Sequence, residues 1–165
     1  MSTETLTITA ETKAETYTEL IPQIETIIST ETNIIANLAN ITAILKETFG
    51  WFWVGFYLCI NKEELVLGPF QGPLACTRIK YGRGVCGTSW KNGETIIVDD
   101  VELFDGHIAC SSLSKSEIVV PIYLKDNIFG VLDIDSEEYS SFDNDDKEGL
   151  ETISTLISQM LEKQL

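Results

Sequence analysis

The cysteines are the side chains of this sequence most able to do chemistry. There are four of them, at positions 59, 76, 86 and 110. No two form a C-x-x-C pair, and the single histidine, His107, cannot complete a usual zinc set. We therefore expect no metal site and no cofactor. Inside a reducing cell such thiols stay free, so they are either buried packing residues or redox-active groups.

The four thiols have different surroundings in the sequence. Cys59 ends the aromatic run "WFWVGFYLCI", where a small apolar side chain fits as core packing. Cys76 and Cys110 lie in segments marked by glycine and proline, where a partner thiol could reach them. Cys86 begins a short helical pattern, whose dipole would lower a thiol pKa. For these three thiols, packing and redox chemistry both remain open.

Three carboxylates could supply acid chemistry. In "GVLDIDS", Asp133 and Asp135 share one face of a predicted strand. Adjacent like charges raise one pKa, and a protonated carboxyl in a pocket can act as a general acid. The alternative is a solvated sheet edge. Glu117 begins the neighbouring apolar run and is equally compatible with a solvated position, where Lys115 could pair with it.

The aromatic run at positions 51–60 predicts a strand. Alternation would put Trp51, Trp53 and Tyr57 on one face, either as core packing or as the wall of a small-molecule pocket. The three glycines of "YGRGVCG" fit neither the G-x-G-x-x-G spacing nor a P-loop, so we exclude a nucleotide site there.

The remaining pattern predicts one α+β domain. Residues 1–14 are rich in Thr and Glu and lack apolar periodicity, so we expect a flexible tail followed by a single domain over residues 15–165. Apolar residues at helical spacing predict helices near 20–28, 34–49 and 144–163, the second capped by Ser29 or Thr32 and ending at Gly50. Strands are expected near 65–72 and 94–100 and in a hairpin over 116–136. The segment 73–84 is expected to be irregular, the segment 85–93 a short helix, and the long loop 99–115 functional.

Charge and hydropathy exclude several classes of function. The net charge is −15, which repels phosphate backbones, so we expect no nucleic-acid partner. No apolar stretch approaches the roughly 18 residues of a membrane span, and the first residues do not resemble a secretory signal. We therefore expect a cytoplasmic protein that does not enter a membrane.

Six segments in this order resemble one enzyme family: "WVGFYL", "LVLGPFQGPLAC", "GRGVCGTSW", "DGHIAC", "KSEIVVPI" and "GVLDIDS". The chain is similar to the free methionine-(R)-sulfoxide reductases of the GAF-domain superfamily from about Trp53 to Leu150. The resemblance implies a GAF fold over residues 15–165, in which a central antiparallel sheet carries the terminal helices on one face and a ligand pocket on the other. It also implies reduction of free L-methionine (R)-S-oxide to methionine, with thioredoxin as the electron donor.

The resemblance implies roles for three of the thiols. Cys110 matches the nucleophile, which would become a sulfenic acid, and Cys76 the thiol that closes a disulfide with it. Cys86 would be a second resolving thiol or the recycler that passes the disulfide outward. The start of a helix also gives Cys86 a reason to be acidic, so which thiol attacks first stays open.

The resemblance also implies a binding pocket. Glu117 and Asp135 would polarise and protonate the sulfoxide oxygen, and Asp133 would bind the substrate. Trp53 and Tyr57 would enclose the thioether. The backbone of Ile108, Ala109 and Cys110 would hold the substrate carboxylate.

Two other readings remain. One is a GAF ligand-binding or redox-sensing module without turnover. The other is a structural dimerisation domain built on the apolar terminal helices. We also expect these helices to form a homodimer interface.

Overall fold

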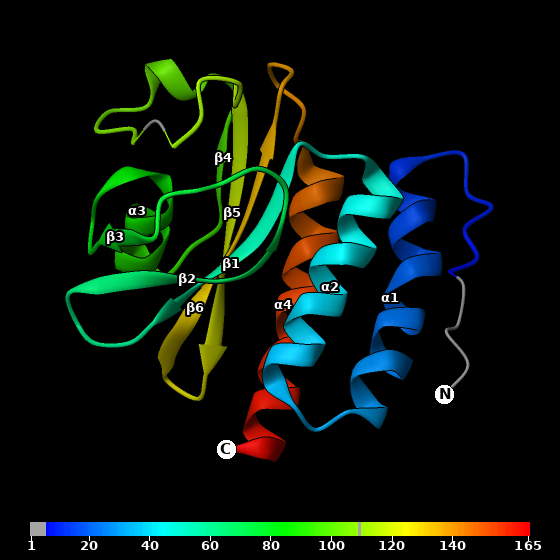
Figure 1. Ribbon diagram of the computed structural model, residues 1–165. Helices are drawn as coiled ribbons and strands as arrows, with labels where there is room; N and C mark the ends of the chain where they lie inside the picture. Colours follow the sequence, from blue (N-terminus) through cyan, green and yellow to red (C-terminus); the bar gives the residue numbers. More distant parts are fainter. Residues whose placement is uncertain (1–5, 109) are drawn as a thin grey trace.

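The computed structural model describes residues 6–108 and 110–165 as a single antiparallel sheet with helices on both faces (Figure 1). The strands are β1 (Trp53–Cys59), β2 (Glu64–Gln71), β3 (Arg78–Lys80), β4 (Ile96–Val98), β5 (Ser116–Leu124) and β6 (Asn127–Ser136), in the order β3-β2-β1-β6-β5-β4. The helices are α1 (Lys13–Thr30), α2 (Ile34–Phe49), α3 (Gly84–Asn92), α4 (Asn144–Gln164) and the 3-10 turn η1 (Val101–Leu103). No helix in the described ranges is long and apolar enough to cross a membrane.

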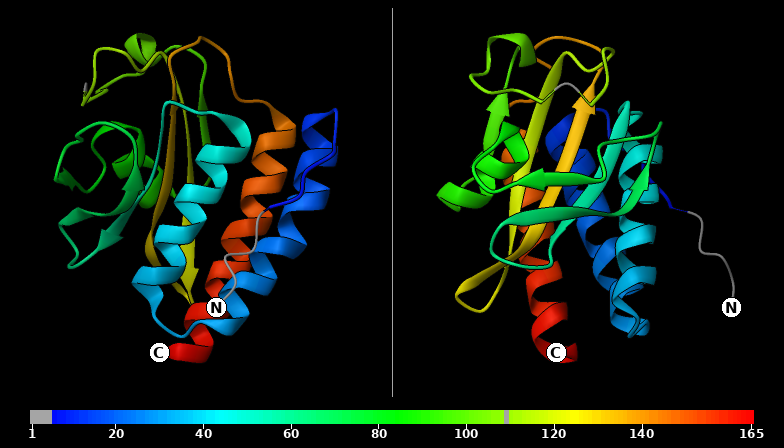
Figure 2. Two further views of the ribbon diagram at one scale, coloured as in Figure 1. Left: turned by 45° about the vertical axis from the view of Figure 1, so that its right-hand side comes forward. Right: turned by 60° about the vertical axis from the view of Figure 1, so that its left-hand side comes forward.

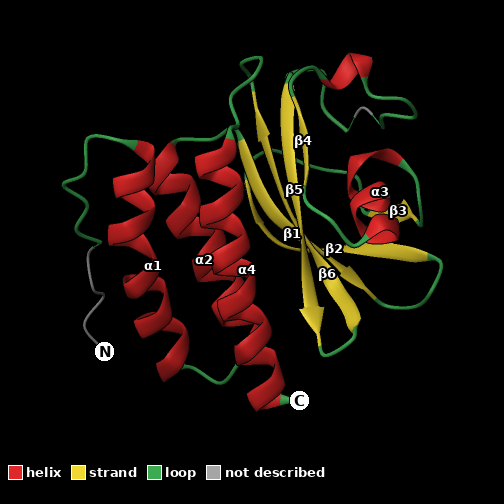
Figure 3. Ribbon diagram, turned by 180° about the vertical axis from the view of Figure 1, so that it is seen from behind, coloured by secondary structure: helices red, strands yellow, loops and turns green. Residues whose placement is uncertain are grey.

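The long helices α1, α2 and α4 all cover one face of the sheet, and α3 with the loop between β4 and β5 covers the other (Figures 2 and 3). The core on the first side is made mainly of aliphatic side chains, among them Leu38, Ile41, Ile134 and Leu150, each fully buried. Burial of this apolar surface is the main force that holds helices to sheet. The predicted α+β class and GAF-like layering are confirmed.

Local sequence signals set the helix ends. Asn33, one residue beyond the predicted cap Thr32, accepts a hydrogen bond from the Ala36 N–H and begins α2. Gly50 ends this helix with φ +68°, as predicted. Asp143 caps α4 through a capping box.

The first helix begins earlier than expected. Thr12 and Glu15 form a capping box, so α1 starts at Lys13, inside the range predicted to be a tail. The N–H groups of Thr7 and Thr9 donate to the side chains of Gln23 and Glu19, over 3.1 and 2.7 Å. Polar side chains of α1, together with packing of Leu6 and Ile8 against the core, hold residues 7–9 on this helix. The division of the chain into a tail and one domain stays a prediction.

Two strand predictions were wrong in detail. Trp51 does not share a face with Trp53, because β1 begins only at Trp53; Trp51 stacks on Phe49 at 4.2 Å in the helix-side core. The segment expected to be irregular contains β3, which pairs with β2 through Leu65 opposite Ile79. A strand of three residues with one buried side chain is too short to show a period-two pattern.

Candidate active site

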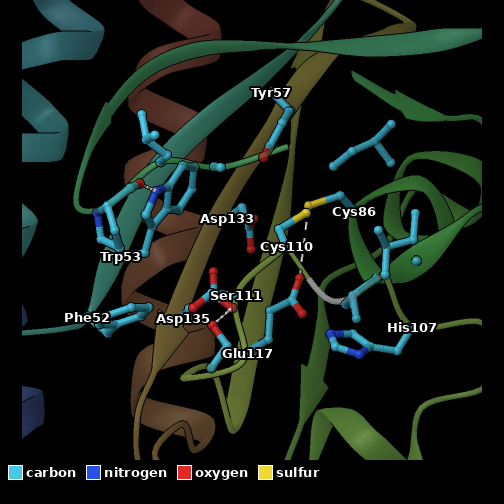
Figure 4. A pocket seen from close by; sticks show the side chains of 18 of the residues that line it. Phe52, Trp53, Tyr57, Cys86, His107, Cys110, Ser111, Glu117, Asp133 and Asp135 are labelled. Carbon is cyan, nitrogen blue, oxygen red and sulfur yellow. Dashed lines mark hydrogen bonds between the residues drawn. The ribbon is translucent and has the colours of Figure 1, made fainter. Parts of the chain in front are cut away.

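A pocket lies on the sheet face opposite α1, α2 and α4 (Figure 4). Strands β1, β5 and β6 form its floor, helix α3 one wall, and the loops around positions 73–75 and 107–114 its rim. It brings together most of the predicted site residues, namely Trp53, Tyr57, Cys86, Ile108, Cys110, Glu117, Asp133 and Asp135. Cys76 reaches it through a bond to Cys110, and Ala109 lies outside the described residues.

Strand register gathers the three carboxyl groups. Glu117 on β5 lies opposite Asp135 on β6, and Asp133 is two residues back on the same strand. Glu117 and Asp133 are each only 6% exposed, so the solvated-edge alternative is wrong for both. Their side chains point into the pocket together with that of Asp135 (Figure 4).

Burial favours the protonated form of these three acids. It raises the pKa of Glu117 and of Asp133 well above the ordinary range, and neighbouring carboxyls raise both further. Burial also raises the pKa of Asp135 to about 6, while the Ser114 hydroxyl, which donates to its Oδ1 over 2.6 Å, opposes that rise. Oδ1 of Asp133 has no hydrogen-bond partner among the described residues. The pocket therefore offers proton donors and, in Oδ1 of Asp133, an acceptor that is free to bind a ligand.

Cys86 lies against the same acids. Its side chain is buried, and its Sγ is 4.0 Å from Oε1 of Glu117 (Figure 4). Burial raises the pKa of this thiol well above its usual value, and Asp133 and Glu117 raise it further. The expected lowering by the helix dipole was therefore wrong, because a dipole contribution of about 1 kcal/mol is small beside the cost of a buried thiolate among carboxyls.

A disulfide joins Cys76 to Cys110, with an S–S distance of 2.04 Å and Cα atoms 5.4 Å apart. The intramolecular disulfide that the resemblance implied is therefore present. Cys110 is exposed and Cys76 is half-buried, so the bond lies at the surface beside the pocket. Cys59 is a free thiol that does not line the pocket, and burial raises its pKa to about 11.

The aromatic wall is tied to the disulfide loop. The rings of Trp53 and Tyr57 lie 5.9 Å apart. Tyr57 donates its O–H to the carbonyl of Cys76 over 2.9 Å, and Trp53 donates its indole N–H to the carbonyl of Pro73 over 3.1 Å. Gly55 permits this arrangement, since a Cβ there would lie 2.2 Å from the Trp53 ring. These aromatic residues therefore position one disulfide partner as well as walling the pocket.

The sequence did not reveal every pocket residue. Ser114 was missed because its bond to Asp135 spans 21 positions and depends on the path of the loop. Phe52 also lines the pocket, as does His107, whose pKa is lowered mainly by burial. The backbone site proposed for the substrate carboxylate is partly occupied, since the Cys110 N–H donates to the Ile108 carbonyl over 3.0 Å.

Comparison with known proteins places this geometry in a family. Residues 33–162 match the GAF domain family. GAF domain-containing protein A of Dictyostelium discoideum is 60% identical over 93% of this chain and 98% of its own length. Free methionine-R-sulfoxide reductase of Escherichia coli is 44% identical over 90% of each chain. The crystal structure of free methionine-R-sulfoxide reductase from Neisseria meningitidis, in complex with its substrate, is 52% identical, covers 97% of this chain and 96% of its own, and superposes with a TM-score of 0.95.

Sequence, fold and pocket thus agree, and the chain belongs to the GAF-domain family, in the group that contains the free methionine-R-sulfoxide reductases.

Proposed function

We propose that this protein reduces free L-methionine (R)-S-oxide to L-methionine. The observation that carries the proposal is the Cys76–Cys110 disulfide beside a pocket with buried, protonated carboxyls and an aromatic wall. A thiol pair and proton donors are what removal of oxygen from a sulfoxide requires. The relatives named as reductases of this substrate support the same conclusion.

The reaction balances with two thiols. Cys110 as a thiolate attacks the sulfoxide sulfur, and oxygen leaves methionine as the cysteine becomes a sulfenic acid. The Cys76 thiol then displaces water from this sulfenic acid and forms the disulfide. Two protons and two electrons have then passed from the thiols to the oxygen. A dithiol must reduce the disulfide before the next turnover.

The three carboxyls would have different roles in binding the substrate and in transferring protons. Glu117 keeps its proton because it is buried, so it can donate a hydrogen bond to the sulfoxide oxygen. Asp135, with a pKa of about 6, exchanges a proton close to neutral pH, which suits a general acid. Asp133 has an open Oδ1, which would accept the substrate ammonium group. The positive charge of the ammonium group would lower the pKa of Asp133, so that its proton is released to solvent and an ion pair forms.

The aromatic wall and the carboxyls of the pocket also define which substrate would fit. Trp53 and Tyr57 would contact the sulfur and its methyl group, as thioethers and aromatic rings favour. A pocket that binds a free ammonium group excludes methionine sulfoxide within a polypeptide. The N–H groups of the loop from Ile108 through Ala109 to Cys110 would bind the carboxylate, after the Cys110 N–H releases the Ile108 carbonyl.

Cys86 would have a secondary role. In the disulfide form it is a buried, protonated thiol, which is a poor nucleophile. We therefore assign it as a back-up resolver or recycler that acts after movement of the Cys110 loop. We propose thioredoxin as the reductant and a homodimer through the terminal helices as the assembly.

One assay tests the function. The protein is mixed with thioredoxin, thioredoxin reductase and NADPH, and each diastereomer of free methionine sulfoxide is added in turn. We expect many turnovers of the R form, little of the S form, and none of a peptide-bound sulfoxide. Ligand binding without NADPH consumption would instead identify a redox-sensing or ligand-binding module.

A further inference from the structure

Three exposed aliphatic side chains lie close along the chain to the two disulfide cysteines. Leu74 is 91% exposed, Ile108 37% and Leu113 54%. Leu74 is two residues before Cys76, Ile108 two before Cys110, and Leu113 three after it. We call these three residues the apolar collar.

The disulfide holds the two halves of the collar together. It joins the loop of Leu74 to the loop of Ile108 and Leu113 with Cα atoms of the cysteines 5.4 Å apart. Leu74 and Ile108 also line the rim of the same pocket. Cys110, between Ile108 and Leu113 in the chain, is itself exposed. The collar therefore borders a bond that an external thiol can reach.

The exposure of Leu74 is maintained by its neighbours. The carbonyls of Pro73 and Cys76, on either side of it, are held by the buried side chains of Trp53 and Tyr57. An anchored backbone presents this leucine to solvent instead of folding it onto the core. A single exposed leucine needs no explanation, but apolar residues grouped at a functional group mark an interaction surface.

The acidic charge around the collar indicates that apolar contacts must supply the affinity for a partner protein. The loop that follows β4 is acidic at Asp99, Asp100, Glu102 and Asp105, and the chain has a net charge of −15. A partner without strong positive charge gains nothing from this field, and salt screens what attraction exists. Burial of aliphatic side chains works at any ionic strength and is independent of charge.

We propose that the apolar collar of Leu74, Ile108 and Leu113 is the docking surface for a protein dithiol reductant that reduces the Cys76–Cys110 disulfide. This inference rests on the proposed function, whose cycle requires such a reductant. The first partner thiolate attacks the sulfur of Cys110, the more exposed of the two cysteines, and expels Cys76 as a thiolate. The second partner thiol attacks the mixed disulfide and releases Cys110. The partner is oxidised to a disulfide, and both cysteines take up protons.

The test compares a protein reductant with a small one. For turnover the variant is Leu113→Ser, because Leu74 and Ile108 line the proposed substrate pocket and Leu113 does not. The double variant Leu74→Ser/Leu113→Ser is kept for reduction of the disulfide without substrate. With thioredoxin we expect kcat/KM for the reductant to fall about tenfold or more, as for the loss of central apolar contacts. With dithiothreitol, which needs no docking surface, turnover should stay unchanged. Ile60→Ser, an exposed aliphatic in the turn after β1, is the matched control and should change neither.

Direct reduction of the disulfide separates this inference from the proposed function. The oxidised protein is mixed with reduced thioredoxin, without sulfoxide, and free thiols are counted against time. The collar is supported if thioredoxin reduces the double variant more slowly than the parent while dithiothreitol reduces both at the same rate. This result would support the collar even if no sulfoxide is turned over. Equal rates for variant and parent with thioredoxin, or an equal loss with both reductants, would overturn it.

Discussion

The hydroxyl of Ser114 donates a hydrogen bond of 2.6 Å to Oδ1 of Asp135 and so links the loop of Cys110 to strand β6. Ser114 is four residues after Cys110 and shares its loop. The bond stabilises the carboxylate form of Asp135 and opposes the effect of burial on its pKa. The other ionisable groups that line this pocket are Tyr57, Arg83, Cys86, His107, Glu117 and Asp133.

Replacing Ser114 should therefore change a pH profile. In Ser114→Ala the carboxylate loses its donor, so the pKa of Asp135 rises above about 6. A hydrogen bond to a charged group is worth about 1.5 kcal/mol or more, which corresponds to about one pH unit. If Asp135 acts as the acid, the decline of kcat/KM with rising pH moves up by about that amount. Ser114→Thr should keep the parent profile.

Ser112→Ala is the control, since Ser112 is an exposed serine of the same loop. Titration of the Asp135 carboxyl carbon by NMR gives the shift without any turnover. A uniform loss of activity at all pH values, with an unmoved midpoint, would show that Ser114 only supports the loop.

The acids themselves should control the chemical step. Glu117→Gln and Asp135→Asn keep the side-chain shape but cannot donate the carboxyl proton. We expect each to lower the rate of methionine formation in a single turnover by about 10²-fold or more. Quenched-flow measurement of methionine, started from the reduced protein, gives this rate. Glu137→Gln, at an exposed position beyond β6, should leave it unchanged.

Much of this molecule can be inferred from its sequence because local signals set its elements. The 3.6-residue period marked α2 and α4, and Gly50 marked the end of α2. Strand β3 was not predicted, because its pairing with β2, and not its composition, makes it a strand. The acidity of Cys86 was misjudged for a similar reason. Its helix position is local, whereas the buried carboxyls that raise its pKa come from β5 and β6, more than 30 residues away in the chain.

The thiols should separate into three kinds of behaviour. Cys110→Ser removes the proposed nucleophile and should give no methionine. Cys76→Ser should still give about one equivalent per protein at once and then turn over only slowly, because the buried back-up thiol of Cys86 is all that remains to resolve the sulfenic acid on Cys110. Cys86→Ser should keep most of the turnover with thioredoxin. Cys59→Ser, which changes a thiol outside the pocket, is the control.

Single-turnover yields and mass spectrometry of the sulfenic acid measure these outcomes. If Cys110→Ser still forms one equivalent of methionine while Cys86→Ser forms none, the roles of the two thiols are exchanged.

The buried acids should also make the protein less stable as the pH rises. The folded-state pKa of Asp133 is raised above its unfolded value, which is about 4. The folded state therefore binds more protons, and the stability that this contributes is complete below pH 4 and is lost as the pH rises toward the folded pKa. Asp133→Asn removes the titration, so its free energy of unfolding relative to the parent should increase between pH 5 and pH 8, by at most about 1.4 kcal/mol for each pH unit. Thermal or urea unfolding at the two pH values, with the disulfide intact, measures it, and Glu137→Gln serves as the exposed control. An equal difference at both pH values would mean that Asp133 does not keep its proton in the folded protein.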